Sequence, residues 1–427
     1  MAIGIFLNSF REGGIERVVA RLIPGFASAG HNVVILSDLG ADYDVMPVVP
    51  SFKRVVLGVG ADRGNRLEDA IRDFKIELCI IENYMSPTVL TDCKIINSKG
   101  IPYIVHFHCS FSVPFLYCST WMNDKEFFDC YSRASALIVL SRYDEYFFRL
   151  IGCNAHYFPN PVEDVPMGFE RREMKHEILW LARFDGQKRP IDAIEVFRRV
   201  LERIPDAKLV MVGGLGSSCG KQVAETVAAD PKLSSSVKLP GFSANVWEWY
   251  SRASVFLSTS VIEGFPCTFM EAAAAGVPIV GYDLPYVETV KGNDGFIAVK
   301  QGDVGAAAEA ICRLFENDEE RAKAGAANRA TFERIKSFDQ MAAYGKLFED
   351  VKSGVRAEPP QGDEVAQLCL KTLTEHAMLG IARLKKDINS CYDTIKRLKK
   401  SKRRKNRLIA ALATVTVLLA TLLLCCG

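Results

Sequence analysis

The sequence predicts an α/β protein made of two consecutive doubly wound domains. Short and almost uniformly apolar runs alternate with longer amphipathic stretches, as expected for parallel strands that helices cover on both faces. The alternation pauses at Pro159-Asn160-Pro161-Val162 and at the charged stretch 170–177, and a second series then begins. Two series of similar size predict two Rossmann-like domains that face each other across a cleft, with ligands at the carboxyl ends of the strands.

The first series begins with a strand over residues 3–7, a turn at Gly13-Gly14 and a helix over 15–29. Its other strands are expected at 33–36, 78–81, 103–105 and 137–140. The second series has expected strands at 178–182, 209–212, 237–239, 255–257 and 279–280, and expected helices at 191–203 and 268–275. The predicted domains are 1–162 and 163–336, followed by a closing helix over 337–354 that returns toward the first domain.

Beyond the closing helix, the sequence predicts a helical, basic linker over 355–407 and a transmembrane helix over 408–426. Apolar residues spaced by three and four within 377–398 form a heptad stripe, which indicates either a coiled coil that makes a homo-oligomer or a helix docked on a surface. Residues 408–426 are uncharged, and a helix of this length spans roughly 28 Å, close to the thickness of the hydrocarbon core. The expected location is therefore a membrane, with a single-pass C-terminal anchor.

Composition narrows the classes of function. The 427 residues carry a net charge of +2, but nine Lys or Arg residues and no acid lie between 396 and 407, so the remainder carries 2 − 9 = −7. An acidic body with one basic cluster argues against a nucleic-acid partner, and the cluster is expected on the cytoplasmic side of the membrane. The 13 Cys residues show no zinc-site spacing, and the first residues lack the basic start of a signal peptide. Both observations indicate that the globular domains lie in the cytoplasm.

Two loops at the ends of predicted strands offer groups to an anion. Gly13-Gly14 joins a strand to a helix, where small residues let a ligand approach the free N–H groups of the helix N-terminus. Arg183 and Lys188 follow the first strand of the second domain, and two cations at that place suit a diphosphate. They would stabilise a leaving group whose charge grows as its bond breaks. Neither loop is specific alone, because Gly pairs are common in α/β packing and loop charges are commonly solvated.

A third motif is more specific. The segment Glu263-Gly264-Phe265-Pro266-Cys267-Thr268-Phe269-Met270-Glu271 places two carboxylates eight residues apart, the first on a loop after a strand and the second in a helix. The loop and the helix N-terminus can present N–H groups to phosphate and sugar hydroxyls. A carboxylate one turn into the helix can accept both hydroxyls of a ribose. Apolar and small residues surround both carboxylates, which argues against two solvated surface Glu residues.

Taken in order, these motifs resemble glycosyltransferase family 4, a family of retaining enzymes with the two-domain GT-B fold. The family has a Gly-Gly turn, an Arg-x4-Lys loop, a Glu-x7-Glu motif and a hinge similar to Pro159-Asn160-Pro161-Val162. The resemblance covers residues 3–352 and leaves the tail outside. It implies a nucleoside diphosphate sugar as the donor substrate.

The resemblance also implies roles for individual residues. Glu271 would bind the ribose, Glu263 would face the donor sugar, and His108 would lie close to that sugar, with His106 as the second candidate for this place. The implied catalytic residues are His108, Glu263, Arg183 and Lys188. The implied donor-binding residues are Gly13, Gly14, Arg183, Lys188, Gly213, Gly214, Gly264, Phe265, Pro266, Cys267, Thr268 and Glu271. The roles of Asp283 and Glu288, which lie where the family often has acidic residues, are left open.

The expected function is transfer of a sugar, with retention of configuration, from a nucleoside diphosphate sugar to a hydroxyl of a membrane-associated or surface-glycan acceptor. UDP is the default nucleotide. No cofactor and no metal is expected, because the Asp-x-Asp sequence Asp42-Tyr43-Asp44 lies far from the donor motifs and is interpreted as a solvated turn. Two alternatives are open: a catalytically inactive GT-B membrane scaffold and a GT-B nucleotide-sugar epimerase.

Overall fold

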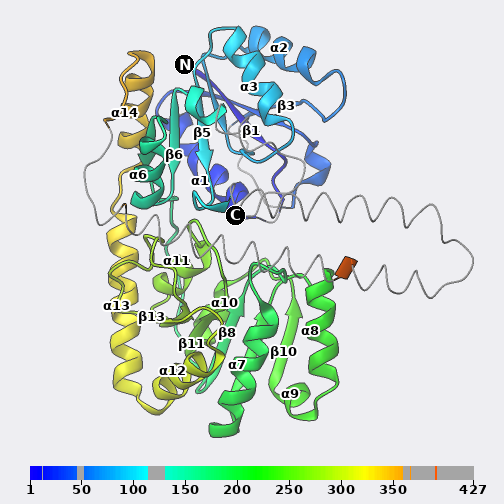
Figure 1. The fold of residues 1–427 in the computed structure, drawn as a ribbon, viewed down its shortest axis with the longest axis vertical. Coiled ribbons are helices and arrows are strands. Elements are labelled where there is room, and N and C mark those ends of the chain that lie inside the picture. The colour runs from blue at the N-terminus through cyan, green and yellow to red at the C-terminus, as the bar shows by residue number, and fades with distance from the viewer. Residues whose placement is uncertain (12, 46–51, 114–129, 359–365, 367–389, 392–427) are drawn as a thin grey trace, which may run out of the picture.

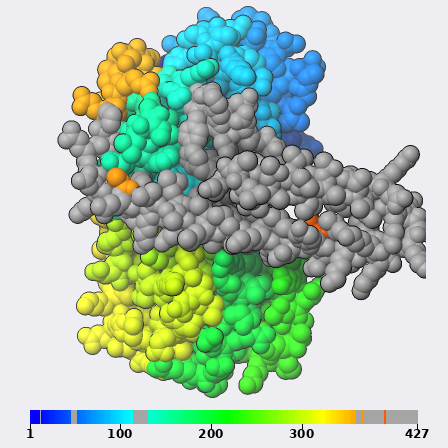
Figure 2. Space-filling model, in the orientation of Figure 1, coloured from blue at the N-terminus to red at the C-terminus, as the bar shows by residue number. Residues whose placement is uncertain are grey.

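The computed structural model describes residues 1–11, 13–45, 52–113, 130–358, 366 and 390–391, and these form two lobes, one above the other in Figures 1 and 2. Each lobe is built around a sheet of parallel strands. The strand order is β3-β2-β1-β4-β5-β6-β7 in the first sheet and β10-β9-β8-β11-β12-β13 in the second. The prediction of two parallel α/β domains is confirmed. In each sheet the strand order reverses once, between β1 and β4 and between β8 and β11, where such sheets bind ligands.

The first domain begins with β1, whose six residues are all buried because helices cover both faces of the sheet. Its strands are β1 (Ala2–Leu7), β2 (Asn32–Ser37), β3 (Lys53–Val56), β4 (Leu78–Ile81), β5 (Tyr103–Phe107), β6 (Ala136–Val139) and β7 (Ala155–Tyr157). Its helices are α1 (Gly14–Ser28), the short η1 (Ala41–Tyr43), α2 (Arg63–Phe74), α3 (Val89–Ser98) and α6 (Arg142–Leu150).

The second domain repeats this alternation. Its strands are β8 (Glu177–Leu181), β9 (Lys208–Val212), β10 (Val237–Gly241), β11 (Val255–Ser258), β12 (Ile279–Tyr282) and β13 (Phe296–Val299). The helices that follow β8 are α7 (Pro190–Arg203), α8 (Ser218–Ala228), α9 (Pro231–Ser236), α10 (Trp247–Arg252), α11 (Cys267–Ala274), α12 (Val304–Glu316), α13 (Asp318–Lys336) and α14 (Gln340–Lys352).

The strands β3, β7 and β13 were not predicted, and all three lie at an edge of a sheet. An edge strand has one neighbour and need not be apolar throughout, so it lacks the uniform signal on which the prediction relied. In β3, for example, all four residues of Lys-Arg-Val-Val are partly or fully exposed.

After α13 the chain returns to the first domain, where α14 packs against α1. Tyr344 and Phe348 of α14 are buried in one apolar cluster with Phe26 of α1 and with residues of β1. The Phe26 and Tyr344 rings meet edge to face, with their centroids 5.0 Å apart. The first domain is therefore completed by a helix that the chain reaches only after the second domain.

The segment that joins the two domains is tied to helices of both. Arg21 of α1 pairs with Glu163 at 2.7 Å, and Asp164 pairs with Arg329 at 2.9 Å and with Lys336 at 2.6 Å. The hydrogen bonds from these two cations of α13 hold the pKa of Asp164 well below its usual range. The two domains are therefore connected by a Pro-rich segment that ion pairs tie to both of them.

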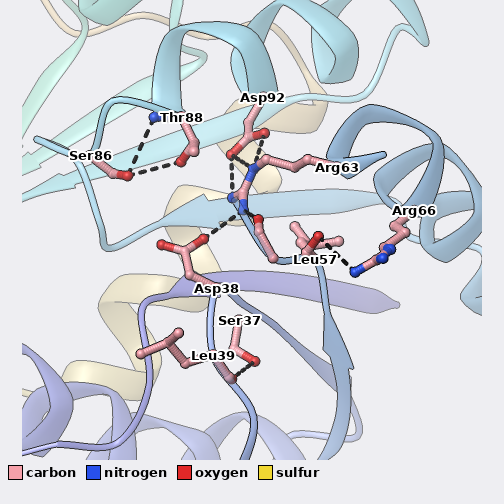
Figure 3. Close-up of polar contacts among 10 residues, drawn as sticks. Ser37, Asp38, Leu39, Leu57, Arg63, Arg66, Ser86, Thr88 and Asp92 are labelled. Atoms are coloured by element: carbon pink, nitrogen blue, oxygen red, sulfur yellow. Dashed lines mark hydrogen bonds and ion pairs between the residues drawn. The ribbon is translucent and has the colours of Figure 1, made fainter. Parts of the chain in front are cut away.

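A buried ion-pair network, shown in Figure 3, fixes the carboxyl edge of the first sheet. Arg63, at the start of α2, pairs with Asp38 after β2 at 2.6 Å and with Asp92 of α3 at 2.7 Å, and it also donates to the Gly58 carbonyl. Burial raises the pKa of both carboxyls, and the Arg63 charge opposes that shift. Three elements distant in sequence are therefore held together at the edge where ligands of such sheets bind.

Two predicted segments, most of the linker over 355–407 and the transmembrane helix over 408–426, lie outside the described residues. Within the described parts of the chain, we find no helix with both the length and the apolar character that a membrane crossing requires.

Candidate functional site

The Glu-x7-Glu segment lies on the side of the second domain that faces the first. Glu263 is on the loop between β11 and α11, and Glu271 is in the second turn of α11. Their exposed fractions are 7% and 5%, so neither is a solvated carboxylate on the surface. Buried carboxylates need partners, and each has one.

Glu263 is paired with Lys188 through a short contact between Oε1 and Nζ. Lys188 lies on the loop after β8, and β8 is hydrogen-bonded to β11, so the two loops emerge from neighbouring strands. The Asp185 carboxylate accepts the Lys188 backbone N–H at 3.1 Å, and the Thr259 hydroxyl donates to the Lys188 carbonyl at 2.7 Å. The sheet topology therefore brings together two predicted residues that are 75 positions apart.

Arg183 is held differently. Its guanidinium pairs with Asp185 at 3.1 Å, and 69% of its side chain is exposed. Burial raises the pKa of Glu16 in the first turn of α1, and the charge of Arg183 acts against that rise. The cation thus stands at the edge of the second domain, within electrostatic range of the first, with room to turn toward a ligand.

Gly213 and Gly214 lie on the loop after β9, and only one of them has no room for a side chain. Gly213 has φ of 151°, and a Cβ there would lie 2.1 Å from the Ala182 carbonyl oxygen, so this loop and the Arg183 loop touch backbone to backbone. A Cβ on Gly214 would meet no atom within 4 Å. Only the first of the two is required by the packing.

Glu271 is paired across the domains. Its Oε1 accepts from Arg17 Nη1 of α1 at 2.7 Å, and its Oε2 accepts from the Tyr250 hydroxyl at 3.0 Å. Sequence reasoning missed Arg17, although there was a signal. A cation in the first turn of a helix opposes the helix dipole, and such a position indicates a role other than helix stability.

Two glycines lie where the domains contact each other. A Cβ on Gly14 would lie 3.9 Å from the Cys267 sulfur, so the Gly13-Gly14 turn faces the N-terminus of α11. A Cβ on Gly264 would lie 2.8 Å from the His108 carbonyl oxygen, so the Glu263 loop packs on the end of β5. The rest of the motif continues this contact: Phe265 and Pro266 are buried, and Cys267 and Thr268 are half-buried. The motifs predicted from separate parts of the sequence thus converge at one interface.

His108 follows β5, while His106 lies within that strand. Both rings contact the carboxylate of Glu82, which directly follows β4: His108 Nε2 is 2.5 Å and His106 Nδ1 is 3.1 Å from Glu82 Oε2. Burial alone would raise the pKa of Glu82, but its interactions with His106 and His108 outweigh burial and lower it to about 2. Burial lowers the pKa of His108 to about 4.

These three residues form the one His/Cys/Asp/Glu group, within the described part of the chain, whose ligand atoms lie within 4.8 Å of one another. A metal ion would lie about 2 Å from each donor atom, which keeps the donors roughly 3 Å or more apart. The 2.5 Å between Glu82 and His108 is a direct hydrogen bond. The arrangement fits a hydrogen-bonded relay better than a metal site.

Two acidic residues whose roles were open lie near this interface. Glu288 Oε1 accepts the backbone N–H of Arg142, at the start of α6 in the first domain, at 2.8 Å. Asp144 of the same helix is buried, and burial raises its pKa to about 7, with the Glu288 charge acting in the same direction. Asp283 instead lies at the end of β12, where its N–H donates to the Val299 carbonyl. Glu288 therefore connects the two domains, and Asp283 connects neighbouring strands.

The Asp-x-Asp sequence lies apart from these residues, and its interpretation as a solvated turn needs a correction. Asp42 is exposed in η1. Asp44, however, pairs with Arg54 at 2.7 Å and accepts the Phe10 N–H at 2.9 Å. The sequence could not show this, because Arg54 belongs to the unpredicted edge strand β3.

One small cavity lies at the interface between the domains. A cavity of about 10 Å³, the size of one water molecule, lies between the hinge and residues of α11 that include Cys267 and Glu271. The larger cavity, of about 310 Å³, lies elsewhere on the second domain, between Gly276, Pro278 and α13. The chemistry of the described residues, rather than cavity size, identifies the candidate site.

Two family models match adjacent parts of the chain. Residues 12–164 match the model for Glycosyltransferase Family 4, and residues 165–331 match the model for Glycosyl transferases group 1. The boundary between the matches falls just after the hinge Pro159-Asn160-Pro161-Val162. The predicted resemblance is confirmed at this level: the chain belongs to the GT-B glycosyltransferases.

Curated relatives and a solved structure agree. The poly(glycerol-phosphate) alpha-glucosyltransferase of Bacillus subtilis is 31% identical over 34% of this chain and 21% of its own length. The N-acetyl-alpha-D-glucosaminyl L-malate synthase of Bacillus anthracis is 24% identical over 46% of this chain and 51% of its own length. A mutant of S. aureus TarM, solved with fondaparinux, alpha-GlcNAc-glycerol and UDP, superposes with a TM-score of 0.66 at 12% identity, over 82% of this chain and 99% of that one. The matches span from a fifth to about half of the two curated relatives, and the TarM likeness shows the fold.

Proposed function

We propose that this chain, built as a GT-B glycosyltransferase, transfers a sugar from a nucleoside diphosphate sugar to a hydroxyl of a membrane-associated or surface-glycan acceptor. The observation that carries the proposal is the meeting of Lys188, Glu263 and Glu271 with the Gly13-Gly14 turn and His108 at one interface. Cations, buried carboxylates and a glycine turn from two domains suit a ligand that has a diphosphate, a ribose and a sugar.

Each charged group has a chemical task in this proposal. Lys188 and Arg183 would stabilise the negative charge that develops on the diphosphate as the glycosidic bond breaks. Glu271 would accept the ribose hydroxyls, because each carboxylate oxygen has a second lone pair beyond those used by Arg17 and Tyr250. Glu263 would orient the donor sugar.

The finer chemistry follows the family resemblance. Transfer would retain the anomeric configuration: the bond from the anomeric carbon to the diphosphate oxygen breaks, the acceptor oxygen bonds to the same face, and the diphosphate takes the acceptor proton. UDP is the proposed nucleotide, and the TarM structure with UDP supports it by similarity of fold. No metal is assigned a step, because Lys188 and Arg183 can provide the positive charge.

The first test is binding and turnover of a panel of nucleotide sugars by the full chain, with Lys188→Ala beside it. One donor is expected to be bound and slowly hydrolysed, and Lys188→Ala should lower kcat/KM by roughly 10²- to 10³-fold, as removal of a single charge-stabilising donor does. The anomeric configuration of the product, read by NMR, tests retention.

The matched control is Arg203→Ala, which removes a cation paired with Glu309 and Glu316 on the outer surface of the second domain. Its kcat/KM should equal that of the wild type. Absence of binding to every nucleotide sugar would favour the inactive scaffold, and interconversion of two nucleotide sugars would favour the epimerase.

We also propose that residues 408–426 anchor the enzyme in a membrane with its domains in the cytoplasm. The support is the uncharged sequence that follows nine basic residues. The full chain should resist carbonate extraction from membranes. Because Arg in the middle of a transmembrane helix costs about 2.5–3.5 kcal/mol on insertion scales, Leu418→Arg should increase the extracted fraction, while Leu398→Arg, outside the proposed span, should not. Equal extraction of all three proteins would contradict the anchor.

A further inference from the structure

The hydrogen bond between Glu82 and His108 fixes where the imidazole proton lies. A carboxylate can only accept, so an unprotonated Nε2 at 2.5 Å from Oε2 would face it lone pair to lone pair. Glu82 is 1% exposed, and its pKa of about 2 means that it is ionised at neutral pH. The proton therefore lies on Nε2 and is donated to Glu82.

The other ring nitrogen is consequently an acceptor. With a pKa of about 4, His108 is neutral at neutral pH and carries a single ring proton, so Nδ1 keeps its lone pair. Nδ1 is also buried, and no group of the described residues donates to it. A buried acceptor without a donor is costly, and the backbone carbonyl of the same residue lies beside Gly264 of the Glu263 loop.

His106 also contacts Glu82 and the His108 ring. It lies within β5, it is 2% exposed, and its Nδ1 approaches the same Glu82 oxygen at 3.1 Å. Its ring lies against that of His108, with the centroids 3.9 Å apart and the ring planes tilted by 36°. The His108 ring is thus held by a hydrogen bond on one edge and by a neighbouring ring on one face, which restricts its rotation.

We propose that Glu82 is a positioning residue that holds His108 as the Nε2–H tautomer, so that Nδ1 accepts a hydrogen bond from a hydroxyl of the donor sugar. This inference rests on the proposed function for its ligand, but the tautomer itself does not. Glu82 acts through His108 and does not touch the sugar. The sugar-binding group is therefore assembled from the ends of two adjacent strands, β4 and β5, before any ligand arrives.

The test begins with the tautomer. The full chain in detergent micelles, with 15N-labelled histidine, should show His108 as the Nε2–H form, assigned by the signals lost in His108→Gln. In Glu82→Gln, the amide can either donate or accept, so His108 should populate the Nδ1–H form. Glu82→Asp retains the charge and should restore the Nε2–H form at least in part. The matched control is Asp206→Asn, which removes the carboxylate beside His176 at 3.0 Å, far from the cleft, and it should leave the His108 signals unchanged.

The second measurement separates an effect on the sugar from an effect on nucleotide binding. Glu82→Gln should lower kcat/KM for the nucleotide sugar by roughly 10- to 100-fold, the range found when the partner that orients a metal-binding histidine is removed. Its affinity for free UDP should equal that of the wild type. An Nδ1–H or protonated His108 in the wild type, an unchanged tautomer in Glu82→Gln, or equal losses for UDP and nucleotide sugar would overturn the proposal. A chain that binds no nucleotide sugar at all would instead refute the proposed function, and the tautomer measurement would stand apart from that result.

Discussion

The two faces that meet in the cleft are built in opposite ways. On the first domain, Glu82, His106 and Arg63 are at most 6% exposed and already have ionic or hydrogen-bonding partners. On the second domain, 16% of the Lys188 side chain and 69% of the Arg183 side chain are exposed, each with a single acidic partner. Buried polar networks are held rigidly, whereas an exposed pair such as Arg183–Asp185 exchanges with water at little cost. The comparison indicates that the first face is preorganised and that the second recruits the charged part of the ligand.

The variant expected to change stability most is Arg63→Met, which leaves Asp38 and Asp92 buried without their cation. Breaking a buried pair by removing one partner costs about 3–5 kcal/mol. Urea unfolding should therefore show a large fall in the free energy of unfolding. Arg72→Met, in the same helix but with a side chain that is 69% exposed, should leave the unfolding midpoint unchanged. Equal midpoints for the two variants would contradict the rigid first face.

A second test of this comparison is the pH dependence of the unfolding free energy, which reports on the buried Asp144 at the interface. The pKa of Asp144 is about 7 in the folded protein and near its usual value of about 4 in the unfolded chain. Between these values the folded protein keeps a proton that the unfolded chain releases, so this residue's contribution to stability falls as pH rises from about 4 to 7 and is level above 7. Asp144→Asn does not titrate. The difference in unfolding free energy between variant and wild type should change by up to roughly 4 kcal/mol across that window, and parallel profiles would refute the shift.

The smallest effect should come from Arg17→Ala, which removes the ion pair between α1 and Glu271. Arg17 is 30% exposed, so the pair is worth about 1 kcal/mol at most. Because the ribose would then no longer share Glu271 Oε1 with Arg17, the donor KM should fall by no more than about fivefold. Arg313→Ala, which breaks an exposed pair with Glu320, is the control. A rise in donor KM specific to Arg17→Ala would show that Arg17 binds the donor instead.

The local sequence pattern was sufficient to predict the elements that are packed against neighbours on both sides. The strands β1, β4 and β8 and the helix α7 appear within one residue of their predicted bounds, because burial on both faces demands continuous apolar runs and a 3.6-residue stripe. The edge strands β3, β7 and β13 were missed because an edge strand need not be apolar throughout. The motifs also predicted which loops and which helix would face the first domain with Arg183, Lys188, Glu263 and Glu271. The catalytic and binding roles of these residues stay predictions.

The partners of these residues could not be read in advance. Glu82 and His108 are 26 residues apart, and Arg17 and Glu271 are 254 apart. Periodicity reports on neighbours within a few residues, and it contains no information on which strand ends become adjacent. The sequence by itself determined two parallel α/β domains and the chemical types placed at their strand ends. Only the tertiary structure decided which of those groups pair, because strand order and domain contact set distances that spacing along the chain does not encode.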